Sequence, residues 1–410
     1  MIAMQKIDRE KQIEEVLSRG VSAIYPSKEL LRERLLSGEP LRIYLGADPT
    51  GPHLHLGHLT NLLTLKRLQK LGHEIIFLIG DFTGRIGDPT DKMAPRQALT
   101  AKEVKANMRT FEEQALCIIK RRIEIRFNSE WYEKKNYWTF EKFIMDLLGY
   151  FSVQNMIERE DFKTRLKENK TIRLQEFIYP LLQGYDGVEL RADIEVGGND
   201  QIFNMSVGRA LRKAHSKNPK RKMSQEEKFF IATTLLEDPN TGKKLMNKSE
   251  GGLINLDDSS DDIFGKVMAL SDEAMFEVGE LCTEMSLERL DALRKEVNPR
   301  EAKAEIAKEV VATIYGSTAA EKAEEKFTKV FVKKEVAQDV PALRVADKTI
   351  TPVNLVFRSG VVKSMSEARR LIIQGGLRIN DHVEREPNRL LALAGGEIIK
   401  IGKRHFFRVK

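Results

Sequence analysis

The sequence predicts an α/β protein: a doubly wound parallel sheet, then an α-helical domain, then a small α+β domain. Three observations predict this architecture. Early in the chain, two strand-length apolar runs flank one amphipathic helix, which is the order of a βαβ unit. Residues 257–336 carry Leu and Ala at helical spacing among many Glu and Lys, and residues 351–410 combine short helix and strand patterns.

The βαβ unit is predicted around Asp48-Pro-Thr-Gly-Pro-His-Leu-His-Leu-Gly-His58. The residues before it, 41–47, mostly alternate apolar with polar side chains, as a strand does. Leucines then recur at helical spacing over 59–71 until Gly72 ends the helix. The nearly continuous apolar run 74–81 is typical of a parallel strand buried on both faces. In such sheets ligands bind at the carboxyl ends of the strands, so segment 48–58 is predicted to hold a nucleotide.

His55 and His58 are three residues apart at the start of the predicted helix, so both rings can face one ligand. The free N–H groups and the positive dipole end of a helix favour a phosphate there. Gly57 between them favours close approach of the ligand to the backbone. A pair of metal ligands and a pair without function are the alternatives. Because no Cys or acidic cluster follows the histidines, we expect no protein-bound metal.

The pattern His-Leu-Gly-His after Asp-Pro-Thr resembles the HIGH signature of class I aminoacyl-tRNA synthetases. Three further segments follow in the order that the family has: a glycine-rich turn at 80–90, a helical segment at 179–186 and a strand with polar residues after it at 192–204. Taken together, these segments resemble the bacterial type of tyrosyl-tRNA synthetase over nearly the whole chain. The resemblance implies a Rossmann-like catalytic domain.

The resemblance also implies a reaction in two steps. The carboxylate of L-tyrosine attacks the α-phosphate of ATP to give tyrosyl-adenylate and pyrophosphate, and the 3′ end of tRNA(Tyr) then takes the tyrosyl group. No protein nucleophile is required, and Mg²⁺ is expected to arrive with ATP as a substrate complex. Donors already aimed at the developing charge would stabilise the transition state.

The family's site residues are carried over where this sequence matches them. For tyrosine, the resemblance assigns Tyr44 and Asp186 to the phenolic hydroxyl, Tyr179, Gln183 and Asp88 to the α-ammonium group, and Gln201 to the carboxylate. For ATP, it assigns His55, His58 and Thr50 to the phosphates, Asp200 to the ribose, and Gly46, Asp48 and Gly198 to the adenylate site. Gly57 joins the predicted ATP-binding residues because of its place between the two histidines. Taken singly, Tyr179 and Gln183 are better explained as half-buried helix residues and Asp186 as the C-terminal surface of that helix. Taken as a set in register with the glycine turns, they favour a binding site.

The second class I signature is a mobile lysine loop, and two segments are candidates. Lys222-Met223-Ser224 lies in a basic stretch and is followed by Gln225 and acidic residues rather than by a second lysine, so we interpret it as a solvated loop. The segment 242–252 matches better, with Lys248 and Ser249 at the end of the family's Lys-Met-Ser-Lys-Ser. Lys248 is expected to contact the phosphates, because a flexible ammonium can follow pyrophosphate as it leaves. The first lysine position falls on Leu245, or on Lys244 if one residue is inserted.

The excess of basic over acidic residues lies in the C-terminal domain. Residues 351–410 hold twelve Lys and Arg against five Asp and Glu, and the net charge of the whole chain is +7. The helix 366–374, ending in Gly375-Gly376 before Leu-Arg-Ile-Asn, resembles the S4 RNA-binding domain. We expect Lys363, Arg369, Arg370 and Arg378 to contact RNA phosphates, which gives affinity rather than sequence specificity. A merely solvated basic face is the alternative.

The predicted domains are a catalytic domain at 1–236 with an insertion at about 123–190, a mobile loop at 237–256, an anticodon-facing α-helical domain at 257–336, a linker at 337–350 and the S4-like domain at 351–410. The insertion is expected to hold a homodimer contact, as in relatives, although its aromatic run at 131–151 fits a domain core equally well.

Composition points to the cytoplasm. Two cysteines, Cys117 and Cys282, are too few for a disulfide framework, so a reducing compartment is expected. Residues 1–11 lack the apolar core of a signal peptide, and no apolar run is long enough to span a membrane.

Two other functions fit parts of the sequence. A tryptophanyl-tRNA synthetase would share the fold and both signatures, but Tyr44 and Asp186 favour a substrate with a hydroxyl group. A catalytically inactive RNA-binding protein derived from a synthetase would explain the altered lysine loop, whereas His55, His58 and Lys248 favour an enzyme.

Overall fold

The computed structural model describes residues 2–90, 99–119, 123–134, 139–216, 227–246, 252–295, 298–329, 341–343, 345, 349–380, 382–393, 395–402 and 405–410 of the 410-residue chain. The chain divides into two compact units, Met1–Glu324 and Glu325–Lys410, each with its own sheet and core. Among the residues described, no helix combines the length and the apolar character needed to cross a membrane.

The first unit is built on a six-stranded sheet with the strand order β1-β6-β5-β2-β3-β4. Its strands are β1 (Val21–Tyr25), β2 (Arg42–Ala47), β3 (Glu74–Ile79), β4 (Glu124–Phe127), β5 (Ile194–Gly198) and β6 (Phe229–Thr233). Strands β2 to β6 run parallel, and β1 pairs antiparallel with β6 at one edge. The α/β prediction is confirmed, including β2, β3 and β5; β1 and β4 are edge strands that were not predicted.

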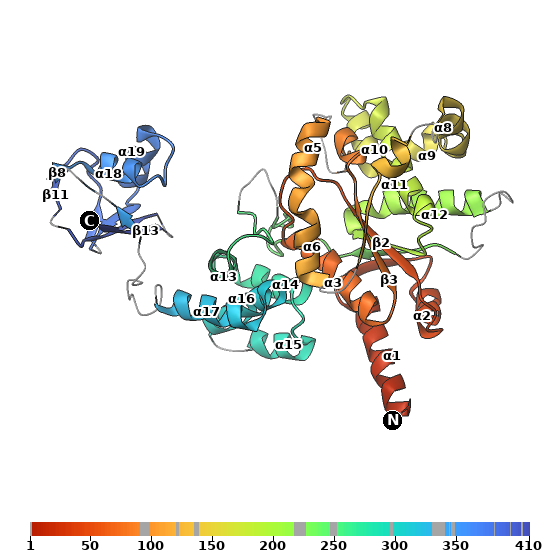
Figure 1. The fold of residues 1–410 in the computed structure, drawn as a ribbon, viewed down its shortest axis with the longest axis horizontal. Coiled ribbons are helices and arrows are strands. Elements are labelled where there is room, and N and C mark those ends of the chain that lie inside the picture. The colour runs from red at the N-terminus through yellow and green to blue at the C-terminus, as the bar shows by residue number, and fades with distance from the viewer. Residues whose placement is uncertain are drawn as a thin grey trace. The chain divides into compact units, whose positions relative to one another are not determined.

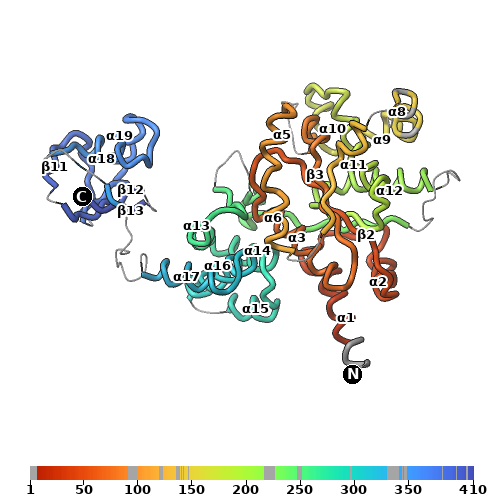
Figure 2. Tube along the Cα trace, viewed as in Figure 1, coloured from red at the N-terminus to blue at the C-terminus, as the bar shows by residue number. Residues whose placement is uncertain are grey.

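Helices connect these strands and cover the sheet (Figures 1 and 2). They are α1 (Ile2–Ser18), α2 (Lys28–Leu36), α3 (Leu56–Lys70), α4 (Thr83–Ile86), α5 (Ala101–Asn107), α6 (Phe111–Ile119), α7 (Ser129–Tyr132), α8 (Phe140–Asp146), α9 (Val153–Ile157), α10 (Glu160–Lys167), α11 (Leu174–Glu189) and α12 (Ile202–Ser216). Short 3₁₀ helices are η1 (Met108–Thr110), η2 (Leu148–Tyr150) and η3 (Asn199–Gln201).

Successive side chains of a strand point to opposite faces of the sheet, and those on one face pack against α11 and α12. Tyr44 of β2 and Ile76 and Leu78 of β3 pack with residues of α11 and α12, such as Leu182 and Leu211. Helix α3 contacts β2, β3 and β5, and α11 packs against α12. The β2–α3–β3 unit thereby brings the end of β2 and the start of α3 to the edge of the sheet where β5 also ends.

The region predicted to be helical at 257–336 is helical wherever the structure describes an element in it. Its helices are α13 (Ser260–Met268), α14 (Asp272–Cys282), α15 (Leu287–Lys295), α16 (Pro299–Tyr315) and α17 (Ser317–Phe327). Helix α14 contacts α3, and α16 contacts α6, so most of these helices belong to the same compact unit as the sheet.

The second unit has a five-stranded sheet with the order β10-β9-β12-β13-β7 and a two-stranded sheet of β8 and β11. Its elements are β7 (Ala342–Leu343), β8 (Thr349–Ile350), α18 (Pro352–Arg358), α19 (Met365–Ile373), β9 (Leu377–Ile379), β10 (His382–Glu384), β11 (Leu391–Ala392), β12 (Ile398–Ile401) and β13 (His405–Val409). The helix predicted at 366–374 is present as α19, and the short helices and strands expected in this domain are present with it. Strands β7 and β8 lie within the predicted linker 337–350 and pair inside this unit, so the unit begins before residue 351. The rest of that linker, except Pro341 and Val345, lies outside the described residues.

Candidate active site

A pocket of about 740 Å³ opens at the carboxyl ends of β2 and β5. It collects residues from five separate segments of the sequence, 44–62, 77–90, 179–186, 195–201 and 233–246. The predicted residues that line it are Tyr44, Gly46, Asp48, Thr50, His55, Gly57, His58, Asp88, Tyr179, Gln183, Asp186, Gly198, Asp200 and Gln201. Lys248 and Ser249 lie outside the described residues, as does the rejected candidate segment 222–224.

The two histidines of the HIGH-like segment lie together at the start of α3. The backbone N–H of His55 donates to Nδ1 of His58 at 3.1 Å, and the ring centroids are 4.0 Å apart. A Cβ atom at Gly57 would lie 3.1 Å from the His55 ring, so a glycine lets this ring fold back over the helix start. The N–H of Leu56 donates to Ile254 O at 3.0 Å, which ties the segment after the lysine loop to the histidines.

Tyr44 and Asp186 form the buried end of the pocket. The Asp186 carboxylate accepts hydrogen bonds from Trp131 Nε1 at 3.0 Å and from Asn128 Nδ2 at 3.2 Å. Asn128 is oriented by the backbone N–H of Phe82, which donates to its Oδ1 at 2.9 Å. A carboxylate has about four acceptor positions, so Asp186 can accept a further hydrogen bond from a ligand.

Burial controls the protonation of both groups. It raises the pKa of Tyr44 well above its ordinary value, and the nearby Glu195 carboxylate adds to the rise, so the phenol keeps its proton. Burial also raises the pKa of Asp186, against the hydrogen bonds from Asn128 and Trp131 that favour its charged form. Within the described part of the chain, Tyr44 Oη completes no hydrogen bond of ordinary geometry. This end of the pocket can therefore satisfy one hydroxyl group of a ligand.

Asp48 is held at the middle of the pocket by two hydroxyl groups. Tyr179 Oη donates to Asp48 Oδ2 at 2.8 Å, and Thr83 Oγ1 donates to Asp48 Oδ1 at 2.7 Å. The glycine-rich turn after β3 closes on this carboxylate, because a Cβ atom at Gly80 would lie 1.9 Å from Asp48 Oδ1. The predicted glycine turn thus has a local reason: any other residue at position 80 would displace Asp48.

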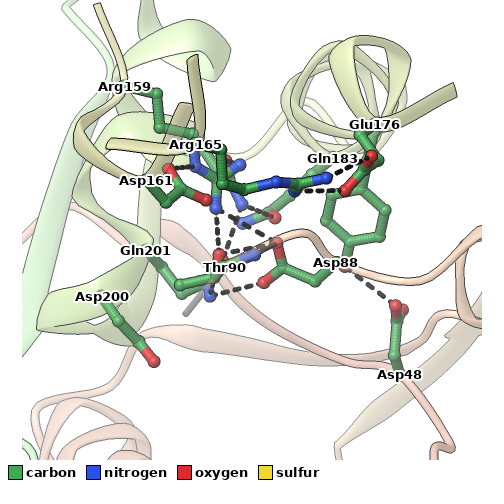
Figure 3. Close-up of polar contacts among 12 residues, drawn as sticks. Asp48, Asp88, Thr90, Arg159, Asp161, Arg165, Glu176, Gln183, Asp200 and Gln201 are labelled. Atoms are coloured by element: carbon green, nitrogen blue, oxygen red, sulfur yellow. Dashed lines mark hydrogen bonds and ion pairs between the residues drawn. The ribbon is translucent and has the colours of Figure 1, made fainter. Parts of the chain in front are cut away.

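Asp88 lies among four polar side chains (Figure 3). Gln201 Nε2 donates to Asp88 Oδ2 at 2.8 Å, and Thr90 Oγ1 donates to Asp88 Oδ1 at 2.6 Å. Arg159, only 5% exposed, is an ion-pair partner of the same carboxylate at 3.4 Å and of Asp161 at 2.8 Å. Asp88 can still accept from a cation on its pocket side, where it lines the cavity.

At the nucleotide end, the structure shows where both candidate residues for the first lysine position lie. Lys244 lines the pocket and pairs with Asp200, with 2.9 Å between Nζ and Oδ2. Leu245 instead uses its backbone N–H to bond Leu236 O at 2.9 Å. Lys244 therefore brings an ammonium group to the carboxylate that the resemblance assigns to the ribose.

Several polar residues that surround the predicted ones were not predicted: Thr83, Asn128, Trp131, Arg159, Glu195, Asn204 and Lys228. Asn128 and Trp131 lie 58 and 55 residues from Asp186 along the chain, so no local pattern joins them. Asn204 was the most accessible to prediction, because it ends the same polar segment that supplies Asp200 and Gln201.

The aromatic run of the insertion belongs in part to the domain core. Trp131 is 3% exposed and Tyr132 packs beside it, whereas Tyr150 is 45% exposed. Tyr137 and Trp138 lie outside the described residues. Within the insertion, the buried ion pair of Arg165 with Glu176, at 2.7 Å, joins α10 to α11 (Figure 3).

In the second unit, the four residues predicted to contact RNA are all exposed. Arg369 and Arg370 lie on α19, Arg378 lies on β9, and Lys363 lies just before α19. Among the described residues, no group of three or more His, Cys, Asp or Glu side chains is arranged to hold a metal ion.

Comparison with known proteins shows which family this chain resembles in sequence. The sequence model of the family described as tRNA synthetases class I (W and Y) matches residues 36–332, and that of the S4 domain matches residues 353–398. The tyrosine–tRNA ligase of Geobacter sulfurreducens is 40% identical over 405 residues, covering 96% of this chain and 97% of that protein. The tyrosine–tRNA ligase of Carboxydothermus hydrogenoformans is 38% identical over 418 residues, covering 98% of each.

Solved structures show the same fold at lower identity. A C-terminally truncated mitochondrial tyrosyl-tRNA synthetase of Aspergillus nidulans superposes with a TM-score of 0.66 at 22% identity, covering 80% of this chain and 100% of that one. The tyrosyl-tRNA synthetase of Archaeoglobus fulgidus, solved with L-tyrosine, gives a TM-score of 0.58 at 20% identity and covers 77% of this chain and 99% of that one.

Proposed function

The chain belongs to the tyrosine–tRNA ligases, class I synthetases that activate tyrosine with ATP and charge tRNA, and we propose how its residues divide this work. The observation that carries the proposal is that one pocket unites the Tyr44–Asp186 pair with the histidines of α3. A substrate hydroxyl at the buried end and a triphosphate at the open end would place the reacting groups between them.

Tyrosine would lie along the pocket. Its hydroxyl group would donate to Asp186 and accept from Tyr44, whose proton is retained because burial raises its pKa. Its α-ammonium group, a donor only, would meet Asp88, Gln183 and Tyr179. Gln201 would direct the carboxylate towards the nucleotide. Phenylalanine would leave the polar groups at the buried end without partners, which opposes its binding.

ATP would lie between Asp48 and Asp200, with its phosphates at the start of α3. His55 and His58, with Thr50, would stabilise the charge that develops as the tyrosine carboxylate attacks the α-phosphate. We propose that ATP is used as its Mg²⁺ complex, with the ion brought by the phosphates. Lys248 would follow the leaving pyrophosphate, and Lys244, already inside the pocket, would act as the first lysine of the signature.

The remaining parts would serve the tRNA. The S4 domain, with Lys363, Arg369, Arg370 and Arg378 exposed, would contact RNA phosphates, and helices α13 to α17 would face the anticodon. These assignments follow the proposed domains: catalytic 1–236 with the insertion 123–190, loop 237–256, helical 257–336 and S4 from about 351. We propose a cytoplasmic location, because the enzyme would charge tRNA(Tyr) and both of its cysteines are free.

We also propose a homodimer formed through the insertion. Several large apolar side chains of this region face solvent in the single chain: Met145 at 66%, Val153 at 64% and Leu174 at 80% exposure. Exposed apolar residues that gather in one region mark interaction sites. Light scattering on the wild type and on Met145→Glu with Val153→Glu tests this, since a dimer that the double variant does not change would place the contact elsewhere.

The first experiment is ATP–pyrophosphate exchange with tyrosine, phenylalanine and tryptophan supplied separately. We expect exchange with tyrosine alone, and its loss in Lys248→Ala. Exchange that survives in Lys248→Ala would remove this lysine from the phosphate site, and exchange with tryptophan instead would reverse the assignment of Tyr44 and Asp186. Binding of tRNA(Tyr) without any exchange would support the inactive RNA-binding alternative.

A further inference from the structure

Asn204, at the start of α12, is fully buried, and its carboxamide touches both glutamines of the proposed tyrosine site. Its Nδ2 donates to Gln183 Oε1 and to Gln201 Oε1, each at 2.9 Å. Its Oδ1 accepts from Arg159 Nη1 at 3.3 Å. All the hydrogen-bonding groups of this side chain thus serve the two glutamines and one arginine.

Arg159, at one end of this hydrogen-bond network, determines which atoms of Asn204 donate and which accept. A guanidinium group can only donate, so the Asn204 atom that faces Arg159 must be the oxygen. The amide nitrogen must then face the glutamines, and both glutamines must turn their oxygens towards it. Arg159 is itself held firmly: it pairs with Asp161 at 2.8 Å, and its guanidinium lies 5.4 and 5.7 Å from the ring centres of Phe162 and Phe203.

The other end of the network sets the same direction. Gln183 Nε2 donates to Glu195 Oε1 at 3.3 Å, and Gln201 Nε2 donates to Asp88 Oδ2 at 2.8 Å. Ionised carboxylates can only accept. The Lys228 ammonium lies 2.6 Å from the other oxygen of Glu195, and an adjacent positive charge favours an ionised carboxylate. A donor-only group and two acceptor-only groups therefore agree on one orientation for all three carboxamides.

We propose that Asn204 is a positioning residue for tyrosine and that Arg159 fixes its orientation. This inference rests on the proposed assignment of Gln183 to the α-ammonium group. An ammonium only donates, so Gln183 must present oxygen to it. If the carboxamide rotated by half a turn, an N–H group would face the ammonium and repel it. Asn204 selects the orientation that binds, although it does not line the pocket.

The substitution Asn204→Asp tests this, because it keeps the size and the acceptor towards Arg159 but replaces the double donor by an acceptor. We expect the KM for tyrosine in pyrophosphate exchange to rise about 10-fold or more, as loss of a hydrogen bond to a charged group does. The KM for ATP should stay within about twofold. Asn155→Asp, on the exposed surface of α9, is the matched control for the added charge. An unchanged KM for tyrosine in Asn204→Asp would overturn the inference.

A second variant separates positioning from stability. In this variant Glu195→Gln and Lys228→Met are added together to Asn204→Asp, because Glu195→Gln alone would leave the buried Lys228 ammonium without its partner. The rotated Gln183 can then donate to the carboxylate introduced at position 204 and accept from the amide introduced at position 195. We expect the midpoint of urea unfolding to recover in part while the KM for tyrosine stays high. Recovery of both would show that Asn204 acts only on stability and would overturn the proposal.

A third variant tests the premise. Gln183→Ala should raise the KM for tyrosine if Gln183 binds the ammonium group. An unchanged KM there would refute the proposed assignment of Gln183, and with it the basis for any effect of Asn204 through that residue. A raised KM in Gln183→Ala with none in Asn204→Asp would leave the proposed function standing and refute the positioning role alone.

Discussion

Lys228 and Glu195 form an ion pair at 2.6 Å that is almost completely removed from water, with side chains 1% and 3% exposed. The ammonium lies 5.3 Å from the centre of the Tyr44 ring. Position 187 must be small for this arrangement, since a Cβ atom at Gly187 would lie 2.4 Å from Lys228 Nζ. The pair therefore supports the buried end of the tyrosine pocket from behind.

We expect Lys228→Met to lower the free energy of unfolding by about 3–5 kcal/mol, because it leaves the buried Glu195 charge without a partner. Urea unfolding followed by tryptophan fluorescence measures this in the first unit, where both tryptophans, Trp131 and Trp138, lie. Adding Glu195→Gln should restore most of the loss. A change below about 1 kcal/mol would show that the charge finds another partner.

Tyr44→Phe should reduce the preference for tyrosine over phenylalanine, measured as the ratio of kcat/KM in pyrophosphate exchange, by about 2- to 10-fold, because one neutral hydrogen bond is lost. Asp186→Asn should reduce it by about 10- to 150-fold, since that bond involves a charge. If the two ratios equal that of the wild type, the hydroxyl group is bound elsewhere.

Lys244→Ala should lower kcat for pyrophosphate exchange at least about tenfold and leave the KM for tyrosine unchanged, if this ammonium stabilises the phosphates. Adding Leu245→Lys decides between the two alignments of the loop. We expect no rescue, because Lys244 lines the pocket and Leu245 does not. Full rescue would assign the first signature position to residue 245.

His73 should make stability depend on pH. The side chain is 5% exposed, its Nδ1 accepts from Leu41 N at 3.2 Å, and burial lowers its pKa from 6.5 to about 4. Between those values the unfolded chain binds the proton and the folded chain does not. The contribution of His73 to the free energy of unfolding is thus fully present above pH 6.5 and is lost on acidification towards about pH 4. The loss amounts to at most about 1.4 kcal/mol per pH unit.

Unfolding midpoints of the wild type and His73→Asn, measured from about pH 7.5 to about pH 4.5, test this effect. Asn can accept from Leu41 N without titrating. As the pH falls, the unfolding midpoint of the wild type should decrease more than that of the variant. A difference in midpoint that stays constant with pH would contradict the predicted role of His73.

Arg369→Gln and Arg370→Gln should weaken tRNA binding and flatten its salt dependence. Each phosphate contact that is lost should reduce the slope of log K against log salt by about 0.7 to 0.9. Filter binding between about 50 and about 200 mM salt measures it. Tyrosine-dependent pyrophosphate exchange without tRNA should not change, and equal slopes in all three proteins would place the RNA on another face.

The sequence predicted the catalytic fold well where the pattern is local. The run 74–81 follows a helix of leucines and is too apolar and too short for anything but a buried strand, and it forms β3. The segments 48–58, 80–90, 179–186 and 196–204 carried most of the predicted pocket residues, and all of those described line it. Edge strands such as β4 were missed because their side chains are half-exposed and their apolar runs are short.

Sequence by itself predicted many of the residues that line the pocket, because strand ends, glycine turns and helix starts depend on neighbouring residues. Only the tertiary structure decided how they are held. Trp131 reaches Asp186, Arg159 reaches Asn204, and Lys228 reaches Glu195 across 55, 45 and 33 residues of chain. The direction of a hydrogen bond and the cost of burying a charge depend on such partners in space, which no spacing in the sequence records.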